Sequence, residues 1–158
     1  QEEFILGSKG EMDMTVKQIS VFLENRSGQL AELTKTLSSN GIDLRTLTIA
    51  ETTEFGIVRM IVNDPDKAAS VLKDAGYVFS VTQVLAVVVP DVPGGLCSVL
   101  EILHDNDINL EYTYAFTSKK KDGAYTIFHV GEKNIEQAVF ALSKKGIEIV
   151  PQRELDSI

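Results

Sequence analysis

Apolar positions recur along the chain with two spacings, and the order of these spacings predicts a set of elements that occurs twice. Ile19, Val21 and Leu23 alternate with the polar residues Gln18 and Ser20, which is typical of a half-buried strand. Residues 30–37 carry leucines at helical spacing, and Asn40-Gly41 is typical of a helix end. The other predicted elements of the first set are strands over 42–50, 55–62 and 77–84 and a helix over 65–75.

The second set repeats this order after residue 85. We expect strands over 86–90, 108–116, 124–130 and 147–150, and helices over 96–103 and 135–142. Asp64-Pro65 can cap and begin a helix, while Gly76 and Gly146 can end helices in a left-handed conformation. The predicted inward-facing helix positions are Leu30, Leu33, Thr34, Leu37, Ala68, Val71, Leu72, Ala75, Leu96, Val99, Leu100, Leu103, Ile135, Ala138, Val139 and Leu142.

The two sets are also similar in sequence at a fixed offset. Residues 21–44 lie over residues 87–110 at an offset of 66, which becomes 70 after a longer loop in the second copy. Identities at apolar and glycine positions favour two copies of one structural unit. The identical pairs include Val21/Val87, Gly28/Gly94, Leu30/Leu96, Leu37/Leu103, Asn40/Asn106, Ile42/Ile108, Leu44/Leu110, Ala68/Ala138, Leu72/Leu142 and Gly76/Gly146.

Each set has the order βαββαβ, which is that of a ferredoxin-like unit. We therefore predict an α+β protein made of two such units, each with an antiparallel sheet and its helices on one face. The predicted boundaries are residues 16–84 and 85–158, with a very short linker or none. Residues 1–15 are interpreted as an N-terminal arm that is flexible or of artificial origin, with the natural start at Met12 or Met14.

Composition and charge exclude several function classes. The 158 residues include 23 acidic and 15 basic side chains, which give a net charge of −8. An acidic chain binds phosphate backbones poorly, so we expect no nucleic acid or membrane partner. No apolar run approaches the roughly 18 residues of a membrane span, and the N-terminus does not have the features of a signal peptide. With a single cysteine, no intrachain disulfide can form, which suits a reducing, cytoplasmic location.

Three families with this fold differ in chemistry, and the sequence separates them. An RNA-recognition motif places basic and stacking aromatic residues on its middle strands, but residues 55–62 and 124–130 do not have the basic-Gly-aromatic pattern. A heavy-metal-binding unit needs a Cys pair in its first loop, and the chain has one cysteine. The third family is the ACT domain, a small-molecule sensor.

The two strand-to-helix loops resemble those of ACT domains. They read Glu24-Asn25-Arg26-Ser27-Gly28-Gln29-Leu30 and Pro90-Asp91-Val92-Pro93-Gly94-Gly95-Leu96. The ACT pattern is an apolar strand, Asn or Asp, any residue, Pro or Ser, Gly, and a helix that begins with Leu. Both loops fit it, although the first has no Pro. The chain resembles stand-alone tandem ACT proteins over about residues 16–158, which implies a regulatory site, most often for an amino acid, where two ACT units meet.

The chemistry of the loops leads to the same site. A helix N-terminus offers unpaired N–H groups and a partial positive charge, which suit a ligand carboxylate. Asn25 and Asp91 can brace the loops or accept from an ammonium, and Arg26 can add a positive charge. The alternative is that these residues only cap the helices. The candidate ligand-binding residues are Asn25, Arg26, Ser27, Gly28, Gln29, Leu30, Asp43, Asp91, Val92, Pro93, Gly94, Gly95, Leu96 and Asn109.

The remaining chemistry-bearing residues are expected to be structural. Cys97 is expected to be a buried thiol in a helix. His104 and His129 belong to no ligand-spaced cluster, so we expect no metal and no cofactor. The run Lys119-Lys120-Lys121 is expected to be solvated, with a partner-docking patch as the alternative.

Apolar residues are also expected on the sheet face away from the helices. Phe22, Val87 and Val89 are assigned to that face. An apolar face of this size must be covered, either by the other unit or by a second chain. We therefore expect a homodimer.

These observations predict a regulatory sensor that binds an amino acid and performs no catalysis. Its target enzyme is not identifiable from the sequence. The alternative is an oligomerisation or interaction module without a small-molecule ligand. A small enzyme is disfavoured because the sequence contains no recognisable nucleophile–base or metal set.

Overall fold

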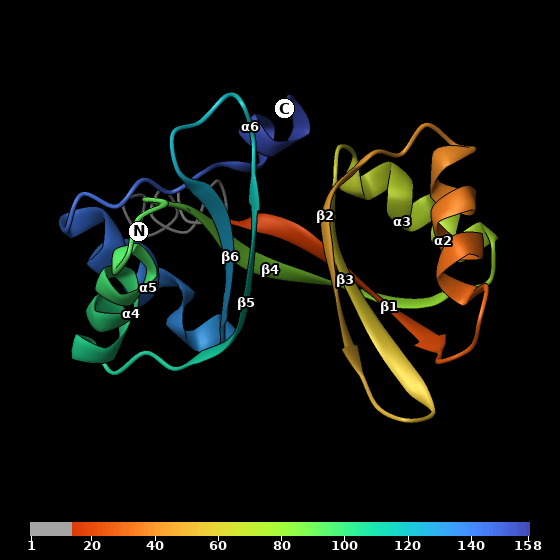
Figure 1. Ribbon diagram of the computed structural model, residues 1–158, viewed down its shortest axis with the longest axis horizontal. Coiled ribbons are helices and arrows are strands. Elements are labelled where there is room, and N and C mark those ends of the chain that lie inside the picture. The colour runs from red at the N-terminus through yellow and green to blue at the C-terminus, as the bar shows by residue number, and fades with distance from the viewer. Residues whose placement is uncertain (1–13) are drawn as a thin grey trace, which may run out of the picture. The chain divides into compact units, whose positions relative to one another are not determined.

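A computed structural model describes residues 14–158 of the chain (Figure 1). The predicted N-terminal arm therefore lies outside the described residues, except for Met14 and Thr15. Thr15 is buried and its hydroxyl donates to Oε1 of Gln83 at 2.6 Å.

The described chain forms two compact units. The first unit contains residues 17–82 and 155–158, and the second contains residues 14–16 and 83–154. The predicted boundary between residues 84 and 85 stays a prediction, because the strand β4 (Val78–Val89) runs through it without a break.

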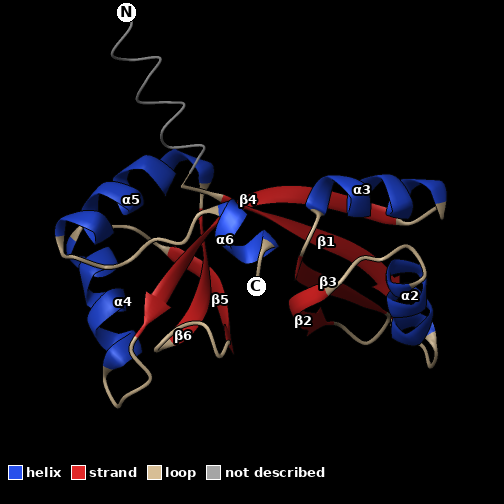
Figure 2. Cartoon of the chain, turned by 90° about the horizontal axis from the view of Figure 1, so that it is seen from above, coloured by secondary structure: helices blue, strands red, loops and turns tan. Residues whose placement is uncertain are grey.

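The first unit has a ferredoxin-like order of elements. Its strands lie in the antiparallel order β2-β3-β1-β4. Both helices lie on one face of the strands (Figure 2). The elements before β4 are β1 (Val16–Glu24), α2 (Gln29–Ser38), β2 (Leu44–Glu51), β3 (Phe55–Val62) and α3 (Pro65–Asp74).

The helix α3 begins where the sequence predicts. The Asp64 side chain accepts a hydrogen bond from the Lys67 N–H at 3.1 Å, and Pro65 occupies the first turn, where no N–H is needed. The core is formed by the alternating side chains of β1 and by the inner faces of α2 and α3. Its fully buried members include Ile19, Val21, Leu33, Leu37, Met60, Ala68 and Leu72.

The second unit repeats this arrangement. The second half of β4 pairs with β6, and β6 pairs with β5, all antiparallel. The last predicted strand is short: the Val150 N–H donates to Ala86 O at 2.7 Å, and Ile149 forms a single bridge with Val87. The other elements are α4 (Gly95–Asp105), β5 (Leu110–Thr117), β6 (Ala124–Val130), the 3₁₀ turn η1 (Glu132–Asn134) and α5 (Ile135–Lys144).

The structure confirms the predicted α+β class with ferredoxin-like units but corrects several positions. Val87 and Val89 belong to the helix-side core together with Leu85, so their assignment to the opposite face is wrong. Phe22 does lie on that opposite face and is exposed. Ala75 and Leu96 are exposed rather than inward-facing: Ala75 follows the last residue of α3, and Leu96 lies in the first turn of α4.

A C-terminal helix was not predicted. The helix α6 (Gln152–Asp156) follows the short last strand, and its last residues belong to the first unit. Arg45 on β2 donates from Nε to Leu155 O and from Nη2 to Asp156 O, both at 2.8 Å. The Arg45 guanidinium therefore provides hydrogen-bond donors for two carbonyl groups at the end of α6. The Leu155 side chain is fully buried.

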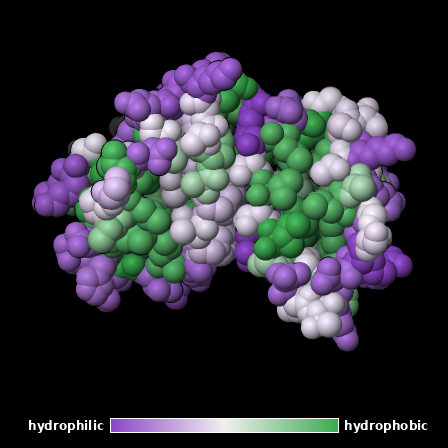
Figure 3. All heavy atoms as spheres, viewed as in Figure 1, coloured by the Kyte–Doolittle hydropathy of each residue, from purple (hydrophilic) through white to green (hydrophobic). Residues whose placement is uncertain are grey.

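Apolar side chains reach solvent on both units in the space-filling view (Figure 3). The exposed large apolar residues are Phe22, Ile49, Phe55, Val78, Val81, Val92, Leu96 and Phe140.

Candidate functional site

The first loop connects β1 to α2, and hydrogen bonds of Asn25 hold it in place. The Asn25 N–H donates to Glu54 O at 2.8 Å, and its side-chain amide donates to Thr52 O at 3.2 Å and to Thr53 O at 3.4 Å. These acceptors form the turn between β2 and β3. Asn25 therefore fixes the loop against that turn and does not cap α2.

Arg26 is engaged within its own loop. Its Nε lies 2.7 Å from Oε2 of Glu24, and both side chains are exposed. The neighbouring Ser27 is exposed as well. The positive charge that we expected for a ligand carboxylate is therefore already paired with Glu24.

The second loop connects β4 to α4 and is tighter. The Val92 N–H donates to Pro90 O at 2.9 Å, and the Gly95 N–H donates to Val92 O at 3.0 Å. A Cβ on Gly95 would lie 2.1 Å from Pro90 O, so only glycine fits at this position. Gly95 thus serves the close approach of two backbone segments. Asp91 and Pro93 are exposed.

Both helices begin at a left-handed glycine without a side-chain cap. Gly28 has φ 87° and Gly94 has φ 83°, and no side chain accepts from the first turn of α2 or α4. The capping interpretation of Asn25 and Asp91 is therefore wrong. The first N–H group of each helix donates within its loop, from Gln29 to Arg26 O and from Gly95 to Val92 O, and no side chain accepts from the N–H groups that follow.

A groove lies beside each helix start. The groove of the first unit has a volume of about 80 Å³, and that of the second unit has about 290 Å³. Binding sites for small molecules usually begin near 300 Å³. The first groove is lined by Leu23, Glu24, Asn25, Arg26, Gln29, Leu30, Ile49, Glu51, Gly56 and Val58. The second is lined by Val89, Pro90, Asp91, Val92, Leu96, Thr113, Tyr114, Ala115, Ala124 and Thr126.

Asp43 and Asn109 lie at the other end of the sheets. Each precedes its strand, β2 or β5, whereas the loops lie beside the last residues of those strands. The Asp43 carboxylate pairs with Nη1 of Arg45 at 2.6 Å, and its N–H donates to Oδ1 of Asn63 at 2.9 Å. Asp43 lines a separate groove of about 390 Å³ beside the end of α2. Neither residue joins the loop sites within its unit.

Cys97 and His129 lie outside the two loop sites. Cys97 is exposed rather than buried, with its Sγ 3.8 Å from Oε1 of Glu101. His129 pairs with Glu111 and stacks on Tyr112 across β5 and β6. Within residues 14–158, no three His, Cys, Asp or Glu side chains are close enough together to hold a metal ion.

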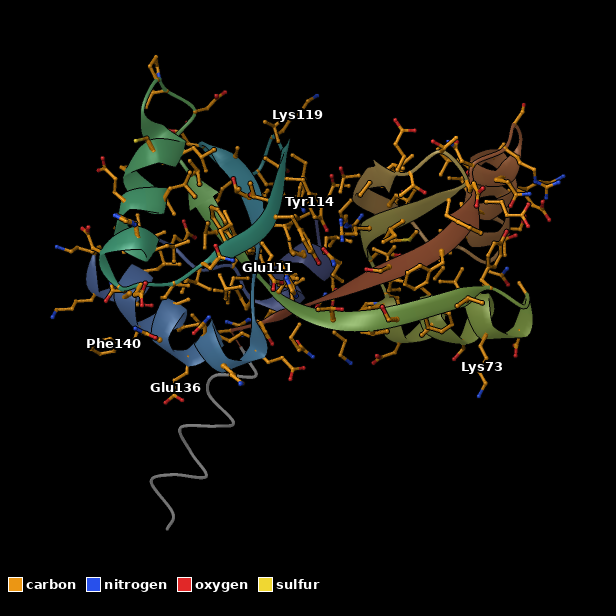
Figure 4. The ribbon with its side chains drawn as sticks, turned by 90° about the horizontal axis from the view of Figure 1, so that it is seen from below. Lys73, Glu111, Tyr114, Lys119, Glu136 and Phe140 are labelled. Carbon is orange, nitrogen blue, oxygen red and sulfur yellow. The ribbon has the colours of Figure 1, made fainter. Side chains whose placement is uncertain are left out.

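Lys121 is not a solvated lysine. Its Nζ lies 2.5 Å from Glu148 and 3.3 Å from Glu154, and only 21% of its side chain is exposed. The hydrogen bond to Glu148 and the charge of Glu154 raise the pKa of Lys121. Burial raises the pKa of the neighbouring Tyr125. In contrast, Lys119 and Lys120 are exposed, and Figure 4 shows Lys119 in the loop after β5.

The sequence reasoning missed the walls of the second groove. Thr113, Tyr114 and Ala115 come from β5, and Ala124 and Thr126 come from β6. Figure 4 shows Tyr114 on β5. The offset that aligns the two loops also aligns β2 with β5, but which residues of these strands face the loop depends on strand pairing.

The family comparison agrees with the fold and the loops. The profile of the ACT domain pair matches residues 14–158, and the chain belongs to this family. A crystal structure of protein BT0572 from Bacteroides thetaiotaomicron is 35% identical, with a TM-score of 0.85 over 93% of this chain and 99% of that chain. A search of curated proteins gives no significant match.

Two regulatory subunits of aspartate kinase share the fold. The ligand-free subunit from Thermus thermophilus is 14% identical, with a TM-score of 0.62 over 84% of this chain and 94% of that chain. The subunit from Thermus flavus is 14% identical, with a TM-score of 0.56 over 81% of this chain and 90% of that chain. Among residues 14–158, no helix is long and apolar enough to cross a membrane.

Proposed function

We propose that this protein is a regulatory sensor that binds an amino acid at a strand-to-helix loop and performs no chemistry itself. The observation that supports this best is the pair of uncapped helix starts, each at a left-handed glycine beside a groove. Membership of the ACT domain pair family supports the regulatory class. Proteins named as regulatory subunits share the fold.

The proposed contacts follow from the charges of a zwitterion. The ligand carboxylate accepts from backbone N–H groups at a helix start, where the partial positive charge is favourable. In the second loop, the exposed carboxylate of Asp91 accepts from the ammonium. Binding stabilises one arrangement of the protein relative to others, and a partner enzyme reads that difference. This function places the protein in the cytoplasm with its target.

Thermal melts of the full chain with each common L-amino acid test this proposal. A ligand at a hundredfold excess over its Kd adds about 2.7 kcal/mol to the free energy of unfolding. For a chain of this size, the midpoint of thermal unfolding then rises by about 5–10 °C. The D-enantiomers are the matched controls. No rise with any L-amino acid at millimolar concentration would overturn the proposal.

One observation favours the interaction-module alternative. Phe140 on α5 is 68% exposed and lies in a surface groove of about 560 Å³. Glu136 lies on the same helix, one turn before it (Figure 4). In this alternative, α5 packs against a second copy of the chain. Light scattering would then give a dimer for the natural protein and a monomer for Phe140→Asp, with Glu136→Gln as the control.

A further inference from the structure

The groove beside α4 in the second unit is wider than the equivalent groove beside α2 in the first unit. The strand registers identify which residues of the two grooves are equivalent. In the first unit, Ile49 pairs with Val58, and Val58 pairs with Val21. In the second unit, Ala115 pairs with Thr126, and Thr126 pairs with Val87. Since Val21 and Val87 are equivalent in the repeat, Ile49 is equivalent to Ala115, and Val58 is equivalent to Thr126.

Smaller side chains at these equivalent positions contribute to the larger volume of the second groove, and the first groove is also lined by the longer side chains of Arg26 and Gln29. The first groove is walled by Ile49 and Leu23, and the second has the smaller Ala115 and Val89 in their places. Leu30 and Leu96 form the same wall in both units. The groove therefore widens from about 80 Å³ in the first unit to about 290 Å³ in the second.

The side chains that line the wider groove favour a ligand with an uncharged, apolar side chain. Asp91 is the only acidic or basic side chain among the described residues that line it. Most of the other wall is aliphatic. The polar positions include two hydroxyls that already donate internally, from Thr113 to Ile127 O at 2.8 Å and from Thr126 to Ala124 O at 3.3 Å. These oxygens are left as acceptors. An acidic ligand side chain would find no cation there, and desolvating it would be costly.

We infer that the groove of the second unit, and not that of the first, is the ligand site, and that it takes a neutral aliphatic L-amino acid. This inference rests on the proposed function. The ligand carboxylate lies at the start of α4, the ammonium lies at Asp91, and the aliphatic side chain packs against Val89, Leu96 and Ala115. The first unit contributes a filled copy of the same groove and binds no ligand in it.

Reciprocal substitutions test the inference on the full chain. Ala115→Ile places the side chain of the first repeat into the second groove. Ile49→Ala is the matched control in the first unit. Isothermal titration with L-leucine, L-valine, L-isoleucine, L-aspartate and L-lysine is done on the natural protein and both variants. We expect an aliphatic ligand to bind the natural protein, Ala115→Ile to weaken it at least tenfold, and Ile49→Ala to change it less than twofold.

The outcomes separate the inference from the function on which it rests. If no amino acid binds the natural protein, the proposed function fails. If one binds but Ile49→Ala weakens or strengthens it more than Ala115→Ile does, the assignment to the second groove is wrong. Tighter binding of L-aspartate or L-lysine than of the aliphatic ligands overturns the ligand class. If Ala115→Ile does not melt cooperatively, Ala115→Val fills the same space with a smaller side chain and is held to the same criterion.

Discussion

Gly28 and Gly94 stand 66 residues apart (94 − 28 = 66) and adopt the same left-handed backbone at the residue before a helix, with φ 87° and 83°. Neither position has a neighbouring atom within 4 Å of a Cβ built on it. Glycine is therefore required here by the backbone conformation alone and not by space. The same turn begins both helices and leaves the first N–H groups without a side-chain acceptor.

Gly94→Ala is expected to lower the free energy of unfolding by about 1 kcal/mol or more, because an L-residue is strained at this positive φ. Gly131→Ala is the control: Gly131 has φ −51° and also has open space around its Cβ position. This substitution is expected to be neutral or to stabilise slightly. Urea unfolding of both variants measures the difference, and equal midpoints would contradict the argument.

Gly95→Ala is expected to be more damaging than Gly94→Ala. Its Cβ would meet the backbone oxygen of Pro90 at 2.1 Å, and a backbone carbonyl in a hydrogen-bonded loop cannot move aside easily. Overpacking of this kind costs about 1–3 kcal/mol. The same urea experiment checks the order, and a Gly95→Ala variant as stable as the natural protein would show that the loop has another accessible conformation.

The cap of α3 offers a test that is separate from ligand binding. Asp64→Ala removes the acceptor of the Lys67 N–H and is expected to cost about 1 kcal/mol. Asp64→Asn keeps a side-chain oxygen at the same place, and its free energy of unfolding is expected to fall by only a few tenths of about 1 kcal/mol. Thermal melts compare the two variants. A similar loss in both would indicate that the charge, and not the hydrogen bond, stabilises the helix start.

Stability is expected to fall at alkaline pH through Lys121 and Tyr125. The hydrogen bond to Glu148 raises the pKa of Lys121, and burial raises the pKa of Tyr125, so folding favours the protonated form of both. A raised pKa in the folded state contributes stability that is complete below the ordinary pKa, about 10 for both groups. That contribution is lost as pH rises through the folded-state values.

Lys121→Gln tests the lysine part of this dependence. Loss of the two carboxylate contacts is expected to cost about 1 kcal/mol near neutral pH and to reduce the alkaline loss of stability. Lys119→Gln is the matched control in the same loop, where the side chain is exposed. Urea midpoints measured from neutral to strongly alkaline pH compare them. Identical pH profiles for the two variants would contradict the assigned role of Lys121.

The strand and helix pattern was predictable because most of the core alternates clearly. The predicted strands 55–62 and 124–130 match β3 and β6. The short helix α6 was not predictable, since its five residues contain one buried side chain, Leu155. A sequence also does not reveal that Arg45 reaches the carbonyls of Leu155 and Asp156. Contacts between residues more than 100 positions apart depend on the tertiary fold.

The candidate site was predictable in its loops but not in its walls. The ACT pattern located Gly28 and Gly94, and the structure places both where the pattern requires. Asp43 and Asn109 follow the first helices in sequence, but each precedes its strand at the end of the sheet away from the loop of its own unit, so their part in ligand binding stays a prediction. Lateral strand pairing decides which residues of β5 face the loop, and residue spacing alone does not contain that information.

Changes in backbone amide chemical shifts would show whether an amino acid binds with its carboxylate at the start of α4. Nuclear magnetic resonance spectra of the ¹⁵N-labelled full chain are recorded during a titration with L-leucine. If L-leucine binds in the second groove, the shifts are expected to be saturable and concentrated at residues 92–97 and 113–115, with residues 26–31 unchanged. Spectra that do not change with L-leucine, L-valine or L-isoleucine, or shifts confined to residues 26–31, would contradict it.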